Sequence, residues 1–414
     1  MIQRKSTVLV AAILAWAGVA GLSAQGVDHE VIVSQLDNEK FLPSVAYNGE
    51  REEFLIVWHN LWPGSRDVNA ARVDRFGRVI SSFNVTTGAN DRAQPAVAYD
   101  PVRDRYLIVW IYDYYGDGSD WDVYGRLVPW YGPDPALTEF PIYSATDSQW
   151  NPKVAYSTGD DEFLVAWGNT SASALASISL GYVAADGNPY YAVTLAGDAS
   201  HNYLNPAITY NQLRNEYLVA YEIDQVDIAA RRVNYLGPVG SQVIVAAWPD
   251  AEVDPAVAAC PGQDQWLVAW QNSAPDVYAR FLFGDGSVDG APLLVPTYPP
   301  PNDAPAVACL PGGARYLVTW EEDYSGGVSG IIGRALGANK VFLTPELEVR
   351  PVFAGQLRDA KTPAVAGGSL GWSVAWVQER EGSTYSDIHA AMVWAVFADD
   401  FETGNTAMWP VVVP

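Results

Sequence analysis

The stretch Pro95-Ala96-Val97-Ala98-Tyr99, followed after a polar turn by Tyr106-Leu107-Ile108-Val109-Trp110, decides the fold because the chain repeats this pattern seven times. The seven copies begin at Pro43, Pro95, Pro152, Pro206, Pro255, Pro305 and Pro363, so successive copies lie 49 to 58 residues apart. Their second halves end at an aromatic residue, namely Trp58, Trp110, Trp167, Tyr221, Trp270, Trp320 and Trp376. A period of about 50 residues is typical of propellers, solenoids and other repeat arrays.

Each repeat predicts four short strands and no helix. Its apolar runs are rich in Val, Ile, Tyr and Trp and are separated by clusters of Gly, Pro, Asp and Asn. Pro141 places the fourth run of the second repeat at an exposed edge, because proline cannot donate to a strand ladder. Four antiparallel strands per repeat indicate the blade of a β-propeller. We therefore expect an all-β, seven-bladed β-propeller over residues 25–397.

The two ends of the repeat region predict how the ring closes. The seventh repeat lacks a fourth strand, whereas an unassigned strand at residues 30–34 precedes the first repeat. We expect this N-terminal strand to complete the last blade, since closure removes open sheet edges that would invite aggregation.

The first residues predict export. Arg4 and Lys5 precede an apolar run over residues 7–22, and Ser23-Ala24 supplies small residues for cleavage, so residues 1–24 are predicted to be a signal peptide. The run is short for a membrane span of about 20 residues, and no second run of that length follows, so we expect no membrane insertion after cleavage. The mature protein is expected to be extracellular or at the cell surface, with the periplasm as the alternative.

The charge balance limits the partners. The formal net charge is −24, and removal of the signal peptide makes the chain more acidic still. Nucleic acids and anionic membranes would be repelled, so we expect no nucleic-acid partner. Carbohydrate, protein and divalent cations remain as ligand classes, and we expect a monomer.

Recurring residues in the strands are interpreted as structural. The aromatic residues that end the second strands fit the space between neighbouring blades. Arginine recurs in the third strands at Arg72, Arg126, Arg231, Arg280 and Arg334, with Tyr182 and Ala391 in the two remaining copies. Because a residue used in five blades does not suit a single catalytic cluster, we expect these arginines to pair between blades with Trp or carboxylate.

The two faces of the ring differ in chemistry. The turns between strands one and two and between strands three and four share one face, called here the turn face. The loops between strands two and three and the interblade connections share the other, called here the loop face, which is longer, acidic and aromatic. Aromatic residues there could stack on sugar rings, or simply pack at the rim: Trp62, Trp121, Trp150, Trp248, Tyr114 and Tyr115.

One acidic loop of that face is a candidate Ca²⁺ site. Asp113, Asp117, Asp120 and Asp122 alternate with glycines that let the backbone curl, and carboxylate oxygens suit a hard cation. The spacing matches no standard calcium loop, so a solvated hairpin tip is the alternative.

The two cysteines of this exported chain predict a disulfide. Cys260 lies five residues after Pro255 and Cys309 lies four after Pro305. This offset of one residue turns the two side chains toward opposite faces of adjacent blades, where they would meet. Two buried thiols are the alternative.

Catalytic motifs are sparse. The four histidines lie in different repeats, and the chain carries no nucleophile elbow, phosphate loop or CxxC pair. No carboxylate pair stands out as a general acid and base.

The pattern P-x-V-A-Y, [FY]-L-V-x-W and D-[VI]-x-x-R resembles repeats of secreted bacterial β-propeller proteins that mostly lack an assigned function. The tail at residues 398–414, with Phe401, Gly404 and Trp409, is similar to a short segment that closes many exported bacterial proteins. The resemblance implies the fold and, for the tail, a role in sorting or surface retention. We expect a non-enzymatic binding or adhesion propeller that recognises a carbohydrate, a protein or a cation. An extracellular glycoside hydrolase or lyase of propeller fold is the alternative.

Overall fold

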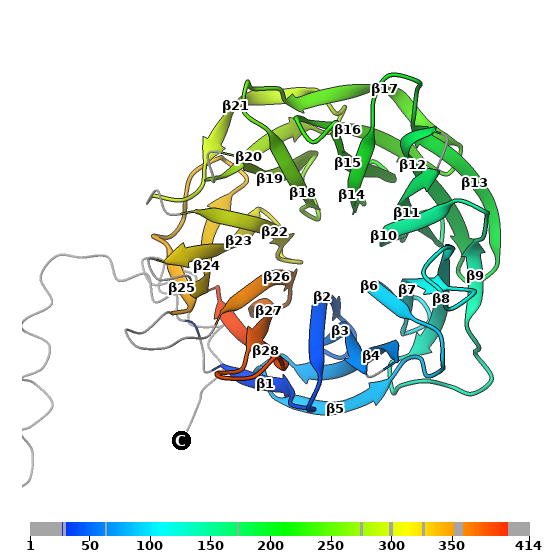
Figure 1. The fold of residues 1–414 in the computed structure, drawn as a ribbon. Coiled ribbons are helices and arrows are strands. Elements are labelled where there is room, and N and C mark those ends of the chain that lie inside the picture. Colours follow the sequence, from blue (N-terminus) through cyan, green and yellow to red (C-terminus); the bar gives the residue numbers. More distant parts are fainter. Residues whose placement is uncertain are drawn as a thin grey trace, which may run out of the picture.

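The computed structural model describes Val27 and residues 30–62, 64–171, 174–273, 276–297, 301–324, 328–351 and 359–395. These residues form seven four-stranded antiparallel sheets arranged in a ring around one axis (Figure 1). The predicted all-β, seven-bladed β-propeller is confirmed. Among the described residues there is no helix long and apolar enough to cross a membrane. The predicted signal peptide and C-terminal tail lie outside the described residues.

Strands one and two of each blade lie nearest the axis and are joined by the tight turns of the turn face. The innermost strands are β2 (Glu39–Asn48), β6 (Arg92–Asp100), β10 (Ser148–Ser157), β14 (Tyr203–Asn211), β18 (Glu252–Ala259), β22 (Asn302–Cys309) and β26 (Ala360–Gly367). The second strands are β3 (Glu53–Trp62), β7 (Arg105–Asp113), β11 (Glu162–Ser171), β15 (Glu216–Ile223), β19 (Gln265–Asn272), β23 (Arg315–Tyr324) and β27 (Gly371–Glu379).

Strands three and four form the outer half of each blade (Figure 1). The third strands are β4 (Ser65–Asp74), β8 (Trp121–Pro129), β12 (Ala174–Ala184), β16 (Asp227–Asn234), β20 (Asp276–Phe283), β24 (Val328–Gly337) and β28 (Ser386–Trp394). The outermost strands are β5 (Val79–Asn84), β9 (Phe140–Tyr143), β13 (Pro189–Ala196), β17 (Gly237–Ala246), β21 (Val288–Leu294), β25 (Leu347–Arg350) and β1 (Val31–Ser34).

The N-terminal strand closes the ring as predicted. The seventh sheet has the order β1-β28-β27-β26, with Val31 opposite Ala390 and Ile32 opposite His389. A buried lysine secures this seam to the first blade, because Lys40 Nζ donates to the carbonyl oxygens of Leu36 at 2.7 Å and Ser386 at 2.8 Å. The two ends of the described chain are therefore joined by backbone pairing and by side-chain hydrogen bonds.

The core lies between neighbouring blades rather than inside a single sheet. The aromatic residues that end the repeat pattern are 0–2% exposed, and they pack against the Val, Leu and Ala side chains of the preceding blade. This burial confirms their structural interpretation. At about 25 cal/mol per Å² of apolar surface, seven such side chains make a large contribution to stability.

The recurring arginines hold blades together, but their partners differ from the expectation. Arg126 donates to the carbonyl oxygens of Leu137 and Asp134 in its own blade and of Val85 in the preceding blade, at 2.7 to 3.1 Å. Arg231, Arg280 and Arg334 make the corresponding bonds to backbone carbonyls. The predicted pairing with Trp or carboxylate is therefore wrong at these four positions.

The strand register also corrects the alignment of this motif. Ile108 is opposite Arg126, and the matching Ile56 is opposite Ala71, so Arg72 lies one residue away from the motif position. Arg72 instead pairs with Glu53 at 2.7 Å within its own blade. Gly181, opposite Val165, occupies the position in the third blade that was assigned to Tyr182.

The structure joins Cys260 and Cys309 in a disulfide between the fifth and sixth blades, with a Cα–Cα distance of 5.2 Å. Cys260 is 1% exposed. The one-residue offset from the repeat prolines turns the two side chains toward each other across the blade interface, as the strand alternation predicts.

Candidate axial site

The proline of each repeat marks a bulge in the innermost strand. In the first blade Phe41 pairs with His59 and Ser44 pairs with Val57, so Leu42 and Pro43 together lie opposite Trp58. The same irregularity recurs opposite the closing aromatic residue of every blade. Proline suits this position because it has no N–H to leave unpaired in the ladder. The Pro and Trp of the repeat pattern therefore form one structural unit.

The residue before each of these prolines has a backbone conformation that is unusual for an L-amino acid. The φ angles are 48° at Leu42, 53° at Gln94, 50° at Asn151, 46° at Asn205, 52° at Asp254, 47° at Ala304 and 49° at Thr362. Positive φ is uncommon outside glycine, and it costs of order 1–3 kcal/mol at each position. The ring of blades maintains seven strained residues around its axis, and their side chains line the central opening.

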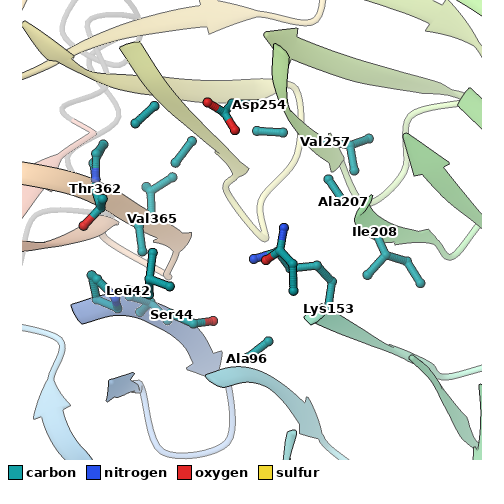
Figure 2. A pocket seen from close by; sticks show the side chains of 18 of the residues that line it. Leu42, Ser44, Ala96, Lys153, Ala207, Ile208, Asp254, Val257, Thr362 and Val365 are labelled. Carbon is teal, nitrogen blue, oxygen red and sulfur yellow. The ribbon is translucent and has the colours of Figure 1, made fainter. Parts of the chain in front are cut away.

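The central opening is a cavity of about 490 Å³ that is lined by residues from all seven blades (Figure 2). Three successive layers form its wall: the residues before the prolines, the residues after them, and a third layer that is β-branched throughout. The third layer consists of Val45, Val97, Val154, Ile208, Val257, Val307 and Val365. The cavity is within the size range of small-molecule sites, and its polar groups are concentrated in the first two layers.

The first layer is asymmetric, because four neighbouring blades contribute amide or carboxylate side chains. Gln94 Oε1 accepts the backbone N–H of Asn151 at 2.6 Å, and Asn151 Nδ2 donates to Asn205 Oδ1 at 3.3 Å. Asn205 Nδ2 donates in turn to Glu222 Oε1 at 2.7 Å. Blades six, seven and one supply Ala304, Thr362 and Leu42 instead, so the opposite side of the wall is less polar.

Two carboxylates behind the wall hold bulge amides in place. Glu222 is fully buried, and its Oε1 accepts the N–H of Asp254 at 2.8 Å. Glu321 occupies the same strand position two blades later, and its Oε2 accepts the N–H of Thr362 at 3.3 Å. Burial, together with a smaller contribution from the neighbouring Asp303 and Asp323, raises the pKa of Glu321 to about 7. Glu321 therefore changes protonation state near neutral pH.

Lys153 and Asp254 are the two charged residues among those that line the cavity. Figure 2 shows both side chains on its wall, Lys153 from β10 and Asp254 from β18. Burial lowers the pKa of Lys153 to about 8, an effect that the charge of Asp254 opposes. Burial likewise raises the pKa of Asp254, and Lys153 opposes that shift. Each charge thus stabilises the other across the opening.

The six aromatic residues predicted to contact ligand lie outside the cavity wall. Trp150 directly precedes the wall residue Asn151 and packs over Gly168, where an added Cβ would approach the indole within 2.3 Å. Trp248 contacts the ring of Trp270 at a tilt and that of Tyr278 edge to face. Trp62 is 37% exposed beside a separate cavity of about 280 Å³ between the first two blades.

Three of these predicted residues lie in or beside the acidic loop of the second blade. Tyr114 and Tyr115 are 53% and 67% exposed and contact each other edge to face. Trp121 Nε1 donates to the carbonyl oxygen of Gly118 at 3.2 Å. These residues form a peripheral aromatic rim rather than part of the axial cavity.

Three of the four predicted Ca²⁺ carboxylates have other partners in the structure, whereas Asp120 Oδ1 is buried without a hydrogen-bond partner. Asp113 is buried and accepts the N–H groups of Gly116 and Gly118, while Asp117 accepts from Ser119. Asp122 is buried and accepts from the hydroxyl of Ser144 and the N–H of Ala145. Within the described ranges, no group of three or more His, Cys, Asp or Glu side chains is arranged to hold a metal ion. These bonds shape the hairpin that was the alternative interpretation.

The axial residues were missed because their strands were interpreted only as scaffold. Comparison of the repeats with one another would have found Lys153, since the residue after the proline is Ser44 or alanine in the six other blades. Asp254 is likewise the one acidic residue before a repeat proline.

No family model and no curated protein matches the chain. Several solved structures share its fold. A GH93 α-L-arabinofuranosidase of Fusarium graminearum with arabinobiose is 13% identical, with a TM-score of 0.55, over 77% of this chain and 99% of that chain. A structure of an α-L-arabinofuranosidase from the same organism with an iminosugar inhibitor gives 12% identity and a TM-score of 0.54, over the same shares. A NanB sialidase variant from Streptococcus pneumoniae is 6% identical, with a TM-score of 0.52, over 87% of this chain and 70% of that chain.

Proposed function

We propose that this protein is an extracellular carbohydrate-binding propeller and that its ligand enters the axial cavity from the loop face. The observation that carries the proposal is the wall of the cavity, where Gln94, Asn151, Asn205 and Asp254 present amide and carboxylate groups. Such groups bond sugar hydroxyls, and the apolar third layer supplies nonpolar contact below them. The predicted signal peptide and the disulfide support the extracellular assignment.

The turn face is less suited to a ligand because its polar groups already bond from blade to blade. Arg51 pairs with Asp104 at 2.7 Å, and Arg103 pairs with Asp161 at 2.6 Å. The loop-face end of the cavity instead offers Lys153 and Asp254 without a direct ion pair between them. This contrast favours entry from the loop face.

Hydrolysis of a bound glycoside is the second candidate function. Glycoside hydrolysis needs one carboxyl group that is protonated at working pH and a second that is ionised. Glu321, with a pKa of about 7, meets the first requirement; Asp254 is the candidate for the second, since the charge of Lys153 counteracts the rise in its pKa that burial causes. The solved glycosidases that share the fold favour this candidate over a purely adhesive role.

A glycan screen of the mature protein, followed by calorimetry, tests the proposal. Asp254→Asn should weaken binding of any glycan found by about tenfold or more, because it removes a charged hydrogen-bond acceptor. Tyr115→Ala on the peripheral rim is the matched control and should leave the affinity unchanged. If Tyr115→Ala alone lost affinity for the glycan, the binding site would lie at the peripheral aromatic rim and not in the axial cavity.

Product release from the same glycans tests the second candidate. Hydrolysis should be lost in Glu321→Gln while binding persists, because glutamine keeps the acceptor for the Thr362 N–H but cannot donate an acidic proton. If the protein binds glycans but releases no reducing sugar from them, hydrolysis is refuted and the binding function alone is supported.

A further inference from the structure

The seven repeats provide an internal comparison for every position of the cavity wall. The residue after the proline is Ser44, Ala96, Lys153, Ala207, Ala256, Ala306 and Ala364 in successive blades. Seven strands converge at the axis, and that crowding favours small side chains. A lysine there is the exception, and its ammonium group is taken partly out of water to occupy the position.

The Lys153 ammonium has an incomplete set of partners. Among the described residues, Asp254 is the charged group that acts on it, and the two do not approach within the 4 Å of an ion pair. A partly buried charge is stable when it is paired and hydrogen-bonded. The cavity that both side chains line therefore offers Lys153 to a ligand group that accepts from an ammonium.

Asp254 limits what that ligand can be. A ligand with several anionic groups would be repelled by this carboxylate, whereas a ligand with one anionic group and several hydroxyls can donate hydrogen bonds to it. Gln94, Asn151 and Asn205 extend the polar wall from the neighbouring blades. A single carboxylate and a set of hydroxyls on a rigid ring describe a uronic acid.

We propose that the sugar bound in the axial cavity is a uronic acid whose carboxylate bonds to Lys153 and whose hydroxyls bond to Asp254 and the amide side chains. This inference rests on the proposed carbohydrate function and names the ligand class of the same site. The net charge of −24 does not oppose it strongly, since exposed charges more than about 8 Å away are screened at physiological salt.

Binding of galacturonate, which carries a single carboxylate, and of its methyl ester to the mature protein tests the inference. The two probes have similar shape, but the ester carries no charge. A charge-assisted hydrogen bond contributes about 1.5–3 kcal/mol, so the wild-type protein should prefer the acid by about tenfold or more. Equal affinities for the acid and the ester would overturn the inference.

Lys153→Met keeps much of the side-chain volume and removes the charge, so it should abolish the preference for the acid over the ester. Lys153→Ala, the residue of five other blades, is a second variant that suits the crowded wall. Lys340→Met is the matched control, since Lys340 pairs with Asp289 outside the cavity. A preference for the acid that survives in both Lys153 variants would refute the assignment of Lys153.

The outcomes separate the inference from the proposed function. If neutral glycans bind in a manner that depends on Asp254, but the acid is not preferred, the carbohydrate site is supported and the assignment of a uronic acid as its ligand is refuted. If no glycan binds, both the proposed carbohydrate function and the assignment of a uronic acid are refuted.

Discussion

Replacing Glu252 with glutamine should stabilise the protein above neutral pH. Glu252 begins β18, two residues before Asp254, and is fully buried, with both carboxylate oxygens close to the N–H of Trp248. Burial, together with smaller contributions from Asp227 and Asp250, raises its pKa from 4.5 to about 7. A glutamine keeps an acceptor for the Trp248 N–H while removing the buried charge.

The sign and size of the effect follow from proton linkage. Below pH 4.5 the carboxyl group is protonated in both the folded and the unfolded state and imposes no penalty. Between pH 4.5 and 7 the unfolded state ionises first, so the stability conferred by the protonated folded form is lost as pH rises. A shift of about 2.5 units corresponds to about 3 kcal/mol at pH 8. The advantage of Glu252→Gln should therefore grow by about 2 kcal/mol between pH 5.5 and 8.0.

Urea unfolding followed by tryptophan fluorescence at these two pH values measures the difference. The exposed Glu50→Gln on the turn face is the matched control and should change the free energy of unfolding by less than about 0.5 kcal/mol at either pH. If Glu252→Gln were equally destabilising at both pH values, the ionised carboxylate would be a net favourable group, and the reasoning about burial would be refuted.

Two further predictions concern the blade interfaces. The Cys260→Ser/Cys309→Ser variant should lose about 4 kcal/mol of unfolding free energy, because the disulfide closes a loop with a sequence separation of 49; a denaturation midpoint equal to that of the oxidised wild type would contradict this. Arg126→Met should cost about 2–4 kcal/mol in the same assay, since it leaves three partly buried carbonyl oxygens without their donor, whereas Arg78→Met, at a 75% exposed side chain, should cost little. Equal losses in the two arginine variants would argue against the interblade role.

The fold was predictable because the sequence shows three features together: a repeat of about 50 residues, a composition typical of strands, and a seventh repeat that lacks its fourth strand. The unpaired N-terminal strand and the incomplete seventh repeat together specify the closure by β1 and β28. The one-residue register error at Arg72 arose because the sequence pattern does not show which residue of a strand lies opposite its neighbour. The backbone carbonyl partners of Arg126 also could not be predicted from the sequence, because their positions depend on where the outer strands end.

The axial site was less predictable for a physical reason. Functional residues usually lie in long loops, so the sequence predicts a site at Tyr114, Tyr115 and the carboxylates of the same hairpin. The strained bulges that turn Asn151 and Asp254 toward the axis are a tertiary feature, because positive φ before a proline runs against the local preference of both residues. A ring of seven blades imposes this conformation, and no single repeat reveals it.

A crystal structure of the mature protein with a glycan taken from the screen would test most directly whether the axial cavity is the binding site. We expect sugar density within hydrogen-bond distance of Asn151, Asn205 and Asp254, above the ring of β-branched side chains. Density confined to the rim at Tyr114 and Tyr115, with none in the cavity, would contradict it.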